Sequence, residues 1–222
     1  MAVVKKHDFV EIEYTGMIRE DNAIFDTTEE KVAKENGVYD KNSDYSPAVI
    51  CIGEGNLLKA LDEQLVGKET GREYRIDVDS GNAFGRKDAR LIQLIPAGKF
   101  RQQNIQPVPG LQLNIDGVFG IVKTVSGGRV LVDFNHPLAG KDLVYDVRIS
   151  RIVEDDKEKL KALLKIHMQI KDAEIEIKDS SAEVRLKQNI PKEAQDEFRK
   201  IAERTVAGVK SISFAVSEQE NK

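Results

Sequence analysis

The stretch EYTGMIREDNAIFD, residues 13–26, decides the fold, because it reads as two strands joined by a turn. Val10, Ile12 and Tyr14 alternate with glutamates, and this period of two predicts a half-buried strand that runs into the stretch. Asp21-Asn22 then favours a turn. The sequence therefore predicts a β-hairpin here.

The second strand of this hairpin would bring Phe25 and Asp26 back beside Tyr14. Two aromatic rings and one carboxylate would then line a common cavity, and an acid in an apolar cavity indicates a function. The alternative is an ordinary hairpin whose end is capped by Asp26. These residues alone favour the ordinary hairpin.

Further segments follow in a recognisable order. They are the YTG strand from Tyr14, the FD pair at Phe25 and Asp26, G-x-G-N-L-L-x-A-L at residues 53–61, A-F-G at residues 83–85 and V-Y-D-V at residues 144–147. This order resembles that of the FKBP-type peptidyl-prolyl isomerases. The resemblance implies an α+β fold, in which an antiparallel sheet wraps around a short helix.

The resemblance covers about residues 3–85 and 137–153 and is interrupted between them. That layout is similar to the SlyD-like branch and the long archaeal members, in which an insert-in-flap domain binds unfolded chains. We therefore expect an isomerase domain of residues 1–85 and 137–153, an insert domain of residues 86–136 and a C-terminal domain of residues 154–222.

The insert is expected to be a small all-β domain. Ala89 to Ile95 suits a strand that Pro96 ends, and residues 115–125 and 129–134 read as strands joined by a hairpin at residues 126–128. A domain this small buries little core, so part of its apolar surface is expected to face solvent and hold extended peptide. The alternative is that these residues only fill the insert's own core.

The C-terminal region is predicted to fold as α-β-β-α-β. A charged helix after residue 153 carries Leu160, Leu163 and Leu164, a hairpin spans about residues 173–186, a helix starts near Pro191, and a strand contains residues 212–216. A three-stranded sheet of this size is marginal alone and has open edges. A homodimer through residues 154–222 is the resulting hypothesis.

Composition restricts the class of protein further. The chain has 222 residues, of which 40% are hydrophobic and 32% charged, as in globular proteins. The net charge of −4 argues against a nucleic-acid partner, although residues 86–136 carry seven basic and three acidic residues. No apolar stretch approaches the ~20 residues that cross a bilayer, so no membrane contact and a cytoplasmic location are expected. Cys51, the single cysteine, lies in an apolar run and favours an inert thiol.

The family resemblance, not the spacing, assigns the site residues. The pocket is expected to be formed by the catalytic residues Tyr14, Phe25, Asp26, Leu57, Leu58, Leu61, Phe84 and Tyr145, with substrate-binding roles for Ile50 in the pocket and for Ile95, Phe100, Ile115, Val118, Phe119 and Ile121 in the insert. For the three leucines, packing of a helix on the sheet is the alternative. Prolyl isomerisation needs no nucleophile, and we expect neither a cofactor nor a metal.

Two positions depart from the small drug-binding members. Leu61 stands where they often have tryptophan, and Phe84 where they have a tyrosine that contacts macrolides.

The expected function is a folding catalyst and chaperone that acts on unfolded, proline-containing polypeptides. The alternative is a holdase chaperone or a scaffold protein with little turnover. A longer segment, residues 29–47, is expected to carry a short helix that ends at Gly37 and to flank the pocket.

Overall fold

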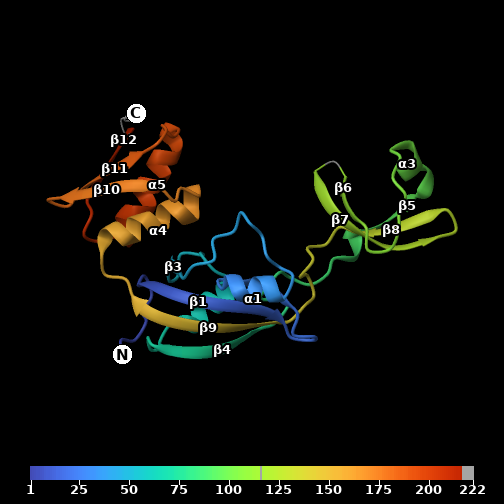
Figure 1. Ribbon diagram of the computed structural model, residues 1–222, viewed down its shortest axis with the longest axis horizontal. Coiled ribbons are helices and arrows are strands. Elements are labelled where there is room, and N and C mark those ends of the chain that lie inside the picture. Colours follow the sequence, from blue (N-terminus) through green and yellow to red (C-terminus); the bar gives the residue numbers. More distant parts are fainter. Residues whose placement is uncertain (116, 217–222) are drawn as a thin grey trace. The chain divides into compact units, whose positions relative to one another are not determined.

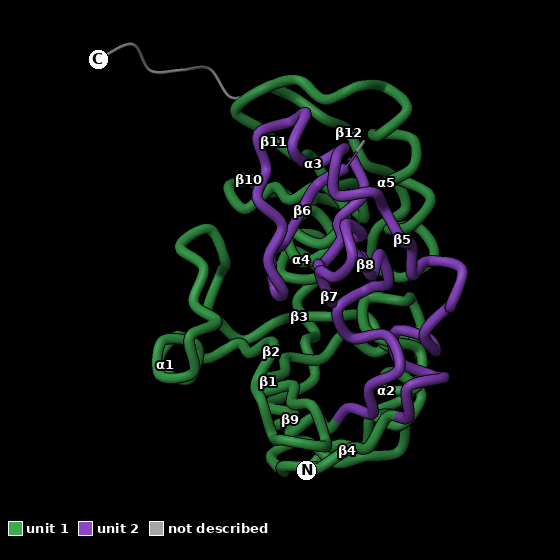
Figure 2. Tube along the Cα trace, turned by 90° about the vertical axis from the view of Figure 1, so that its right-hand side faces the viewer, with its two compact units in different colours: residues 1–78, 144–222 green, residues 79–143 purple. Residues whose placement is uncertain are grey.

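A computed structural model describes residues 1–115 and 117–216. The chain divides into two compact units, shown in green and purple in Figure 2. Unit 1 is formed by Met1–Val78 together with the chain from Val144 onward, and unit 2 is formed by Asp79–Leu143. Each unit has a sheet and a buried core of its own.

The larger sheet of unit 1 has five strands: β1 (Phe9–Ile18), β2 (Ile24–Thr27), β3 (Ala48–Cys51), β4 (Arg72–Val78) and β9 (Leu143–Ile152). The strand order is β2-β1-β9-β4, and β3 pairs with β1. In Figure 1, β1, β9 and β4 run side by side. Both β2 and β3 pair antiparallel with β1, β3 with its first half and β2 with its second.

The predicted hairpin is confirmed. Val10 and Ile12 are fully buried in β1, as the alternation requires. β1 ends at Ile18, whose carbonyl accepts a hydrogen bond from the Asn22 amide, and Asn22 has φ of +55°, a conformation that asparagine tolerates in turns. The return strand β2 places Asp26 opposite Gly16.

Two short helices belong to this part of unit 1. α1 (Glu30–Glu35) ends two residues before Gly37, which has φ of +71°, so the short helix predicted from the sequence is confirmed. α2 (Lys59–Leu65) packs on β4 through its buried Leu61 and Leu65.

The C-terminal elements follow the predicted α-β-β-α-β order. They are α4 (Asp156–Met168), β10 (Ala173–Lys178), β11 (Ser181–Leu186), α5 (Lys192–Thr205) and β12 (Ser211–Val216). Asp155 caps α4 by accepting a hydrogen bond from the Glu158 amide, and Pro191 precedes the first turn of α5. β11 pairs antiparallel with β10 and parallel with β12.

The C-terminal elements share a core with the larger sheet. Phe9, Cys51 and Val153 lie in the same buried cluster as Leu160 of α4 and Phe198 of α5. Burial of apolar surface is the main term that stabilises such a contact. The C-terminal elements therefore form part of unit 1.

Unit 2 is built on a four-stranded sheet with the order β5-β8-β7-β6. Its elements are η1 (Ala89–Leu91), β5 (Ile92–Pro96), α3 (Ala97–Gln102), β6 (Gln112–Ile115), β7 (Val118–Ser126) and β8 (Arg129–Asp133). Phe100 of α3 is buried with Leu113, Val122, Val130 and Val132. The predicted hairpin at Gly127-Gly128 is confirmed, because Ser126 pairs with Arg129 and both glycines have positive φ.

Three details of unit 2 differ from the sequence prediction. The strand expected from Ala89 begins only at Ile92, after a turn of 3₁₀ helix, and it includes Pro96. The strand expected over residues 115–125 is two strands, because β6 ends at Ile115 and β7 begins at Val118. The unit was also expected to be all-β, but it contains a short helix, α3, whose Phe100 is buried in the core.

Candidate active site

The candidate site begins with a hydrogen bond between β1 and β2. The hydroxyl of Tyr14 donates to Asp26 Oδ2 over 2.8 Å. The strand register holds both residues in place, since the Thr28 amide donates to the Tyr14 carbonyl and Asp26 pairs with Gly16. The Asp26 carboxylate itself is exposed.

Three aromatic rings gather beside this carboxylate. Tyr145, on the neighbouring strand β9, is buried, and its ring centroid lies 6.2 Å from that of Tyr14 and 5.8 Å from that of Phe25. The Phe25 contact is edge-to-face at 89°, a favourable arrangement for aromatic quadrupoles. The Asp26 carboxylate therefore lies beside a cluster of aromatic rings.

Gly16 makes this ring arrangement possible. A Cβ atom at Gly16 would lie 2.6 Å from Phe25 Cζ, which would force the Phe25 ring to move, and 3.0 Å from Tyr145 Cε1, a tight contact. Position 16, which lies at the irregularity in β1 between Gly16 and Met17, therefore requires glycine if the Phe25 ring is to keep its place.

Both phenol groups of the site are held in the neutral form. Burial raises the pKa of Tyr14 far above its usual value, and the nearby Asp26 charge and its hydrogen bond add to the shift. Burial, followed by the charge of Asp26, raises the pKa of Tyr145 to about 12. At physiological pH, Tyr14 is consequently a hydrogen-bond donor to Asp26 and not a second anion.

Asp26 lies at a cavity of about 360 Å³. Its walls are formed by Tyr14, Phe25, Asp26, Thr27 and Thr28 of the hairpin, by Ala33 of α1, by Val38, Ser43, Asp44, Tyr45, Ser46 and Ala48, and by Lys165 of α4. The segment between α1 and β3 flanks this cavity. The set of residues around the acid therefore extends well beyond the hairpin.

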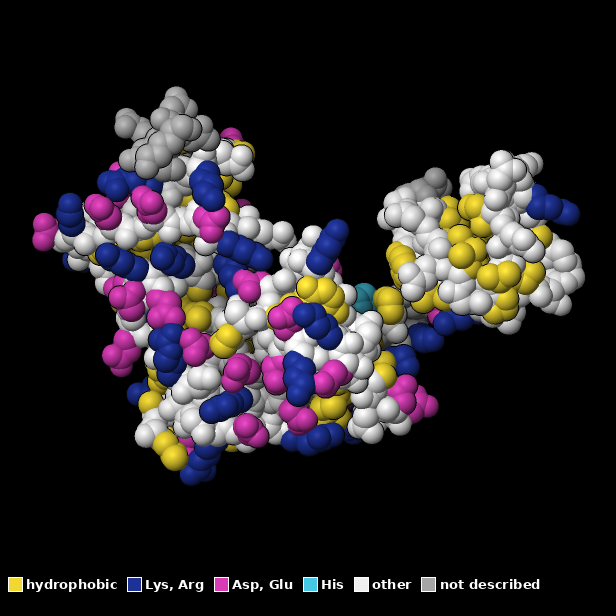
Figure 3. Space-filling view, in the orientation of Figure 1, with side chains coloured by type: hydrophobic (Ala, Val, Ile, Leu, Met, Phe, Trp, Pro, Cys, Tyr) yellow, Lys and Arg dark blue, Asp and Glu magenta, His cyan; other side chains and the backbone are white. Residues whose placement is uncertain are grey.

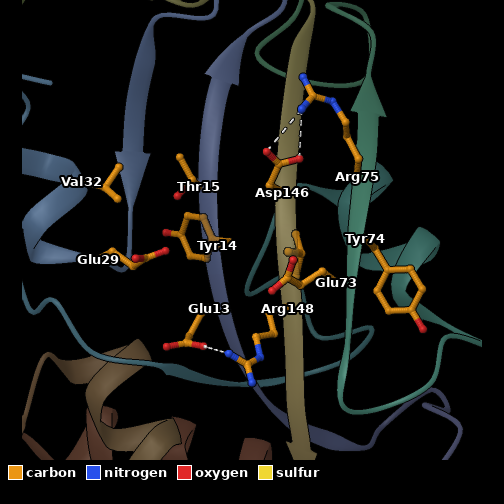
Figure 4. Close-up of a pocket in the computed structure, with 11 residues that line it drawn as sticks. Glu13, Tyr14, Thr15, Glu29, Val32, Glu73, Tyr74, Arg75, Asp146 and Arg148 are labelled. Atoms are coloured by element: carbon orange, nitrogen blue, oxygen red, sulfur yellow. Dashed lines mark hydrogen bonds and ion pairs between the residues drawn. The ribbon is translucent and has the colours of Figure 1, made fainter. Parts of the chain in front are cut away.

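A larger hollow of about 790 Å³ lies on the same unit, and Figure 4 shows its lining. It shares Tyr14 with the first cavity but contains neither Phe25 nor Asp26. Two ion pairs cross it, Arg75 with Asp146 at 3.4 Å and Arg148 with Glu13 at 3.8 Å. Because this hollow lacks the Phe25–Asp26 pair, we take the cavity at Asp26 as the candidate site.

The other residues expected in the pocket lie elsewhere. Leu57 and Leu58 are half-buried just before α2, whereas Ile50 and Leu61 are buried. None of the four is among the residues that line the cavity at Asp26. The burial of Leu61 is what helix-to-sheet packing requires, and its catalytic role stays a prediction.

Phe84 belongs to unit 2. Its ring stacks on the ring of His136, with centroids 4.4 Å apart and planes 3° from parallel. The His136 Nδ1 atom accepts a hydrogen bond from the Leu138 amide at 3.2 Å, which fixes the orientation of this imidazole. The role of Phe84 in catalysis also stays a prediction.

The expected substrate-binding residues of unit 2 divide by exposure. Val118 and Phe119 expose 52% and 41% of their surface, and Ile95, Ile115 and Ile121 are half-buried. Phe100 instead belongs to the core, as the alternative interpretation held, and does not contribute to the surface. Figure 3 shows hydrophobic side chains gathered on one face of this unit, and the exposed ones include Leu91, Leu94 and Val125.

Lys165 lines the cavity and was not predicted from the sequence. It belongs to the C-terminal region, and no spacing or motif in the sequence connects it to Asp26.

Within the described residues, no cluster of three or more His, Cys, Asp or Glu side chains is suited to bind a metal. In the same part of the chain, no helix is both long enough and apolar enough to span a membrane.

Similarity to known proteins identifies the family. The family described as FKBP26, IF domain, matches residues 93–138. A short-type peptidyl-prolyl cis-trans isomerase from Methanocaldococcus jannaschii is 31% identical over 156 residues, which cover 70% of this chain and 98% of that protein. A probable FKBP-type 16 kDa isomerase from Pseudomonas fluorescens is 36% identical and covers 52% and 79% of the two chains.

Two further similarities were found. SlyD of Escherichia coli, an FKBP-type peptidyl-prolyl cis-trans isomerase, is 30% identical over 59% of this chain and 68% of its own. The N-terminal domain of FKBP42 from Arabidopsis thaliana aligns over 69% of this chain and 79% of its own with a TM-score of 0.36 and 13% identity, and the assignment does not rest on it. On the sequence similarities, this chain belongs to the FKBP-type peptidyl-prolyl cis-trans isomerases, in the branch that carries an inserted IF domain.

Proposed function

We propose that this isomerase rotates X-Pro peptide bonds in the cavity beside Asp26 and that unit 2 binds the unfolded or partly folded chains that contain them. As a member of its family, the protein is an enzyme and a folding catalyst. The observation that carries the assignment of the site is the hydrogen bond from Tyr14 to Asp26 within the cluster of three aromatic rings.

Catalysis requires only that the cavity favours the twisted peptide bond. The uncatalysed rotation crosses a barrier of ~18–20 kcal/mol because the planar amide is stabilised by resonance. An apolar environment disfavours the charge-separated resonance form, and a surface that fits the twisted bond better than the planar one lowers the barrier. Phe25 supplies such apolar surface in the cavity, and Tyr145, which is not among the lining residues, supports the Phe25 ring by an edge-to-face contact. Each 1.36 kcal/mol of this preference increases the rate about tenfold.

Asp26 acts in this scheme as a fixed negative charge and hydrogen-bond acceptor. Tyr14 donates to Oδ2, and we assign the Oδ1 atom to a backbone N–H of the substrate. No proton has to be transferred in the rotation. Leu57, Leu58, Leu61 and Phe84 remain proposed contacts of the substrate or supports of the cavity. Because Leu61 and Phe84 replace macrolide-contacting residues of the small members, we expect weak macrolide binding.

Unit 2 is the proposed binding site for client chains. Val118 and Phe119 expose apolar surface at the start of β7, and apolar surface of this kind can hold extended peptide segments. Since both units belong to one chain, a bound client stays at high effective concentration near the catalytic cavity. Proline-containing peptides and non-native polypeptides are the proposed partners.

Two assays test whether unit 2 binds client chains while the cavity beside Asp26 catalyses the rotation. The variant Val118→Ser/Phe119→Ser should turn over a short X-Pro peptide as the wild type does, but should assist refolding of a proline-limited protein several-fold less. Thr124→Ala, an exposed position on the same strand, is the matched control. A holdase or scaffold without turnover would protect the client from aggregation yet leave peptide exchange at the spontaneous rate.

Two further proposals concern assembly and location. β10 is an edge strand of the C-terminal sheet, which supports a homodimer formed through residues 154–222. Light scattering on the full chain decides this, because a monomeric mass at micromolar concentration excludes it. We also propose a cytoplasmic location, in keeping with the free, buried thiol of Cys51.

A further inference from the structure

The cavity at Asp26 has a wall that the strands of the hairpin do not supply. Residues 38–47, between α1 and β3, form what we call the wall loop, and this loop contributes Val38, Asp44 and Tyr45 among others to the lining. Lys165 of α4 also lines the cavity. The C-terminal elements, which lie outside the resemblance to small isomerases, therefore reach the site.

Lys165 is joined to the wall loop by an ion pair. Its Nζ atom lies 2.8 Å from Asp44 Oδ2, and Lys171 Nζ lies 3.8 Å from the same oxygen. The side chains of Lys165 and Asp44 are 38% and 35% exposed, so the pair is partly shielded from solvent. The hydrogen bond from Lys165, followed by that from Ser46, lowers the pKa of Asp44, which keeps this carboxylate charged at neutral pH.

The wall loop is also tied to itself. The rings of Tyr39 and Tyr45 stack with centroids 5.4 Å apart, and the Tyr45 hydroxyl accepts a hydrogen bond from the Asp40 amide. The Ser43 amide donates to the Asp40 carbonyl at 3.1 Å. A loop held together in this way responds as one body when its link to α4 through Asp44 is changed.

We propose that Lys165 is a positioning residue of the isomerase, which holds the wall loop against the cavity through Asp44. The proposal rests on the proposed function, because it concerns the same cavity. If so, the C-terminal region influences the affinity of the cavity for the substrate. Val38 and Tyr45 of the wall loop offer apolar contacts, so peptides with an apolar residue beside the proline depend most on this link.

The test is a double-mutant cycle on Lys165 and Asp44, read by turnover of a tetrapeptide with leucine before proline. Lys165→Met and Asp44→Asn should each lower kcat/KM about threefold to fivefold, mainly by raising KM, because a wall contact is made in both the ground state and the transition state. The double variant should lose no more than either single variant. Lys165→Arg, which keeps the ion pair, should stay near the wild type.

Lys161→Met is the matched control, because Lys161 is an exposed lysine on the same helix. Hydrogen exchange of the Asp40 and Ser43 amides gives a reading that does not depend on turnover. Lys165→Met should accelerate it and Lys161→Met should not. Losses that add in the double variant, or unchanged kcat/KM with unchanged exchange in Lys165→Met, would overturn the proposal. A wild type without turnover would instead defeat the proposed function, while the exchange reading would still decide the link.

Discussion

The Tyr14 hydroxyl of β1 donates a hydrogen bond of 2.8 Å to Asp26 Oδ2 of β2, and the two strands are joined by a connection of five residues, 19–23. Because burial keeps Tyr14 neutral, this bond orients the carboxylate without placing a second negative charge next to it. The two residues thus act as a unit, in which one supplies the charge and the other its orientation.

Loss of the Tyr14 hydroxyl should lower turnover less than loss of the Asp26 charge. We expect Tyr14→Phe to reduce kcat/KM about threefold and Asp26→Asn about tenfold or more, since each 1.36 kcal/mol is a factor of ten. The double variant should resemble Asp26→Asn alone, because the hydroxyl acts through the carboxylate. Protease-coupled peptide assays on the four proteins measure this. Fully additive losses would show that the two residues act separately.

A methyl group at Gly16 should disrupt the ring cluster. Gly16→Ala places a Cβ atom within 2.6 Å of Phe25 Cζ, so the ring must move, at a cost of about 1–3 kcal/mol in stability. Turnover should fall at least tenfold, since Phe25 forms a wall of the cavity. Gly81→Ala, where the added Cβ meets no atom within 4 Å, is the control for a glycine substitution as such. Urea unfolding and peptide turnover together check this, and a fully active Gly16→Ala would contradict it.

High pH should destabilise the fold through Tyr145. Its pKa is about 12 in the folded protein and about 10 in the unfolded chain. The unfolded state therefore loses this proton first, and the stabilisation is intact below pH 10 and lost as pH rises toward 12. Tyr145→Phe should flatten that part of the decline in the free energy of unfolding. Urea titrations at several alkaline pH values test the difference, and parallel curves for both proteins would refute it.

Because α5 and β3 share one buried core in unit 1, a destabilising substitution in α5 should increase the exposure of Cys51 in β3. Phe198→Ala should cost about 3–5 kcal/mol, and Cys51, which lies in the same buried cluster, should then react faster with a thiol reagent. Burial raises the pKa of Cys51 to about 12, so the folded wild type should react very slowly at pH 8. Val132→Ala, in the core of unit 2, is the control and should leave the reaction of Cys51 unchanged.

Local patterns predicted most of the fold. The alternation in β1 and the spacing of apolar residues in α4 and α5 are signals carried by neighbouring residues, and all three elements form as predicted. The division of residues 115–125 was missed, although the amino-acid pair Asp-Gly at positions 116–117 is a sequence signal that commonly favours a hairpin turn. α3 has only six residues and no side-chain cap, so it depends on the burial of Phe100 and leaves little local signal.

Long-range contacts explain what could not be predicted at the site. Tyr14, Phe25 and Asp26 are close in sequence, and hairpin geometry alone brings them together. The ion pair of Lys165 with Asp44 joins residues of different elements, and no periodicity encodes it. The absence of Leu61 from the cavity lining likewise follows from how α2 packs on β4, which its amphipathic pattern leaves undetermined.

The most direct test is the cis–trans exchange rate of a short X-Pro peptide, measured by NMR exchange spectroscopy with catalytic amounts of protein. Wild-type protein should accelerate exchange by orders of magnitude over the spontaneous process, which takes tens to hundreds of seconds. Asp26→Asn, at the same concentration and with the same thermal stability, should lose most of that acceleration. Exchange at the spontaneous rate with the wild type, or full acceleration by Asp26→Asn, would contradict the assignment of catalysis to the cavity beside Asp26.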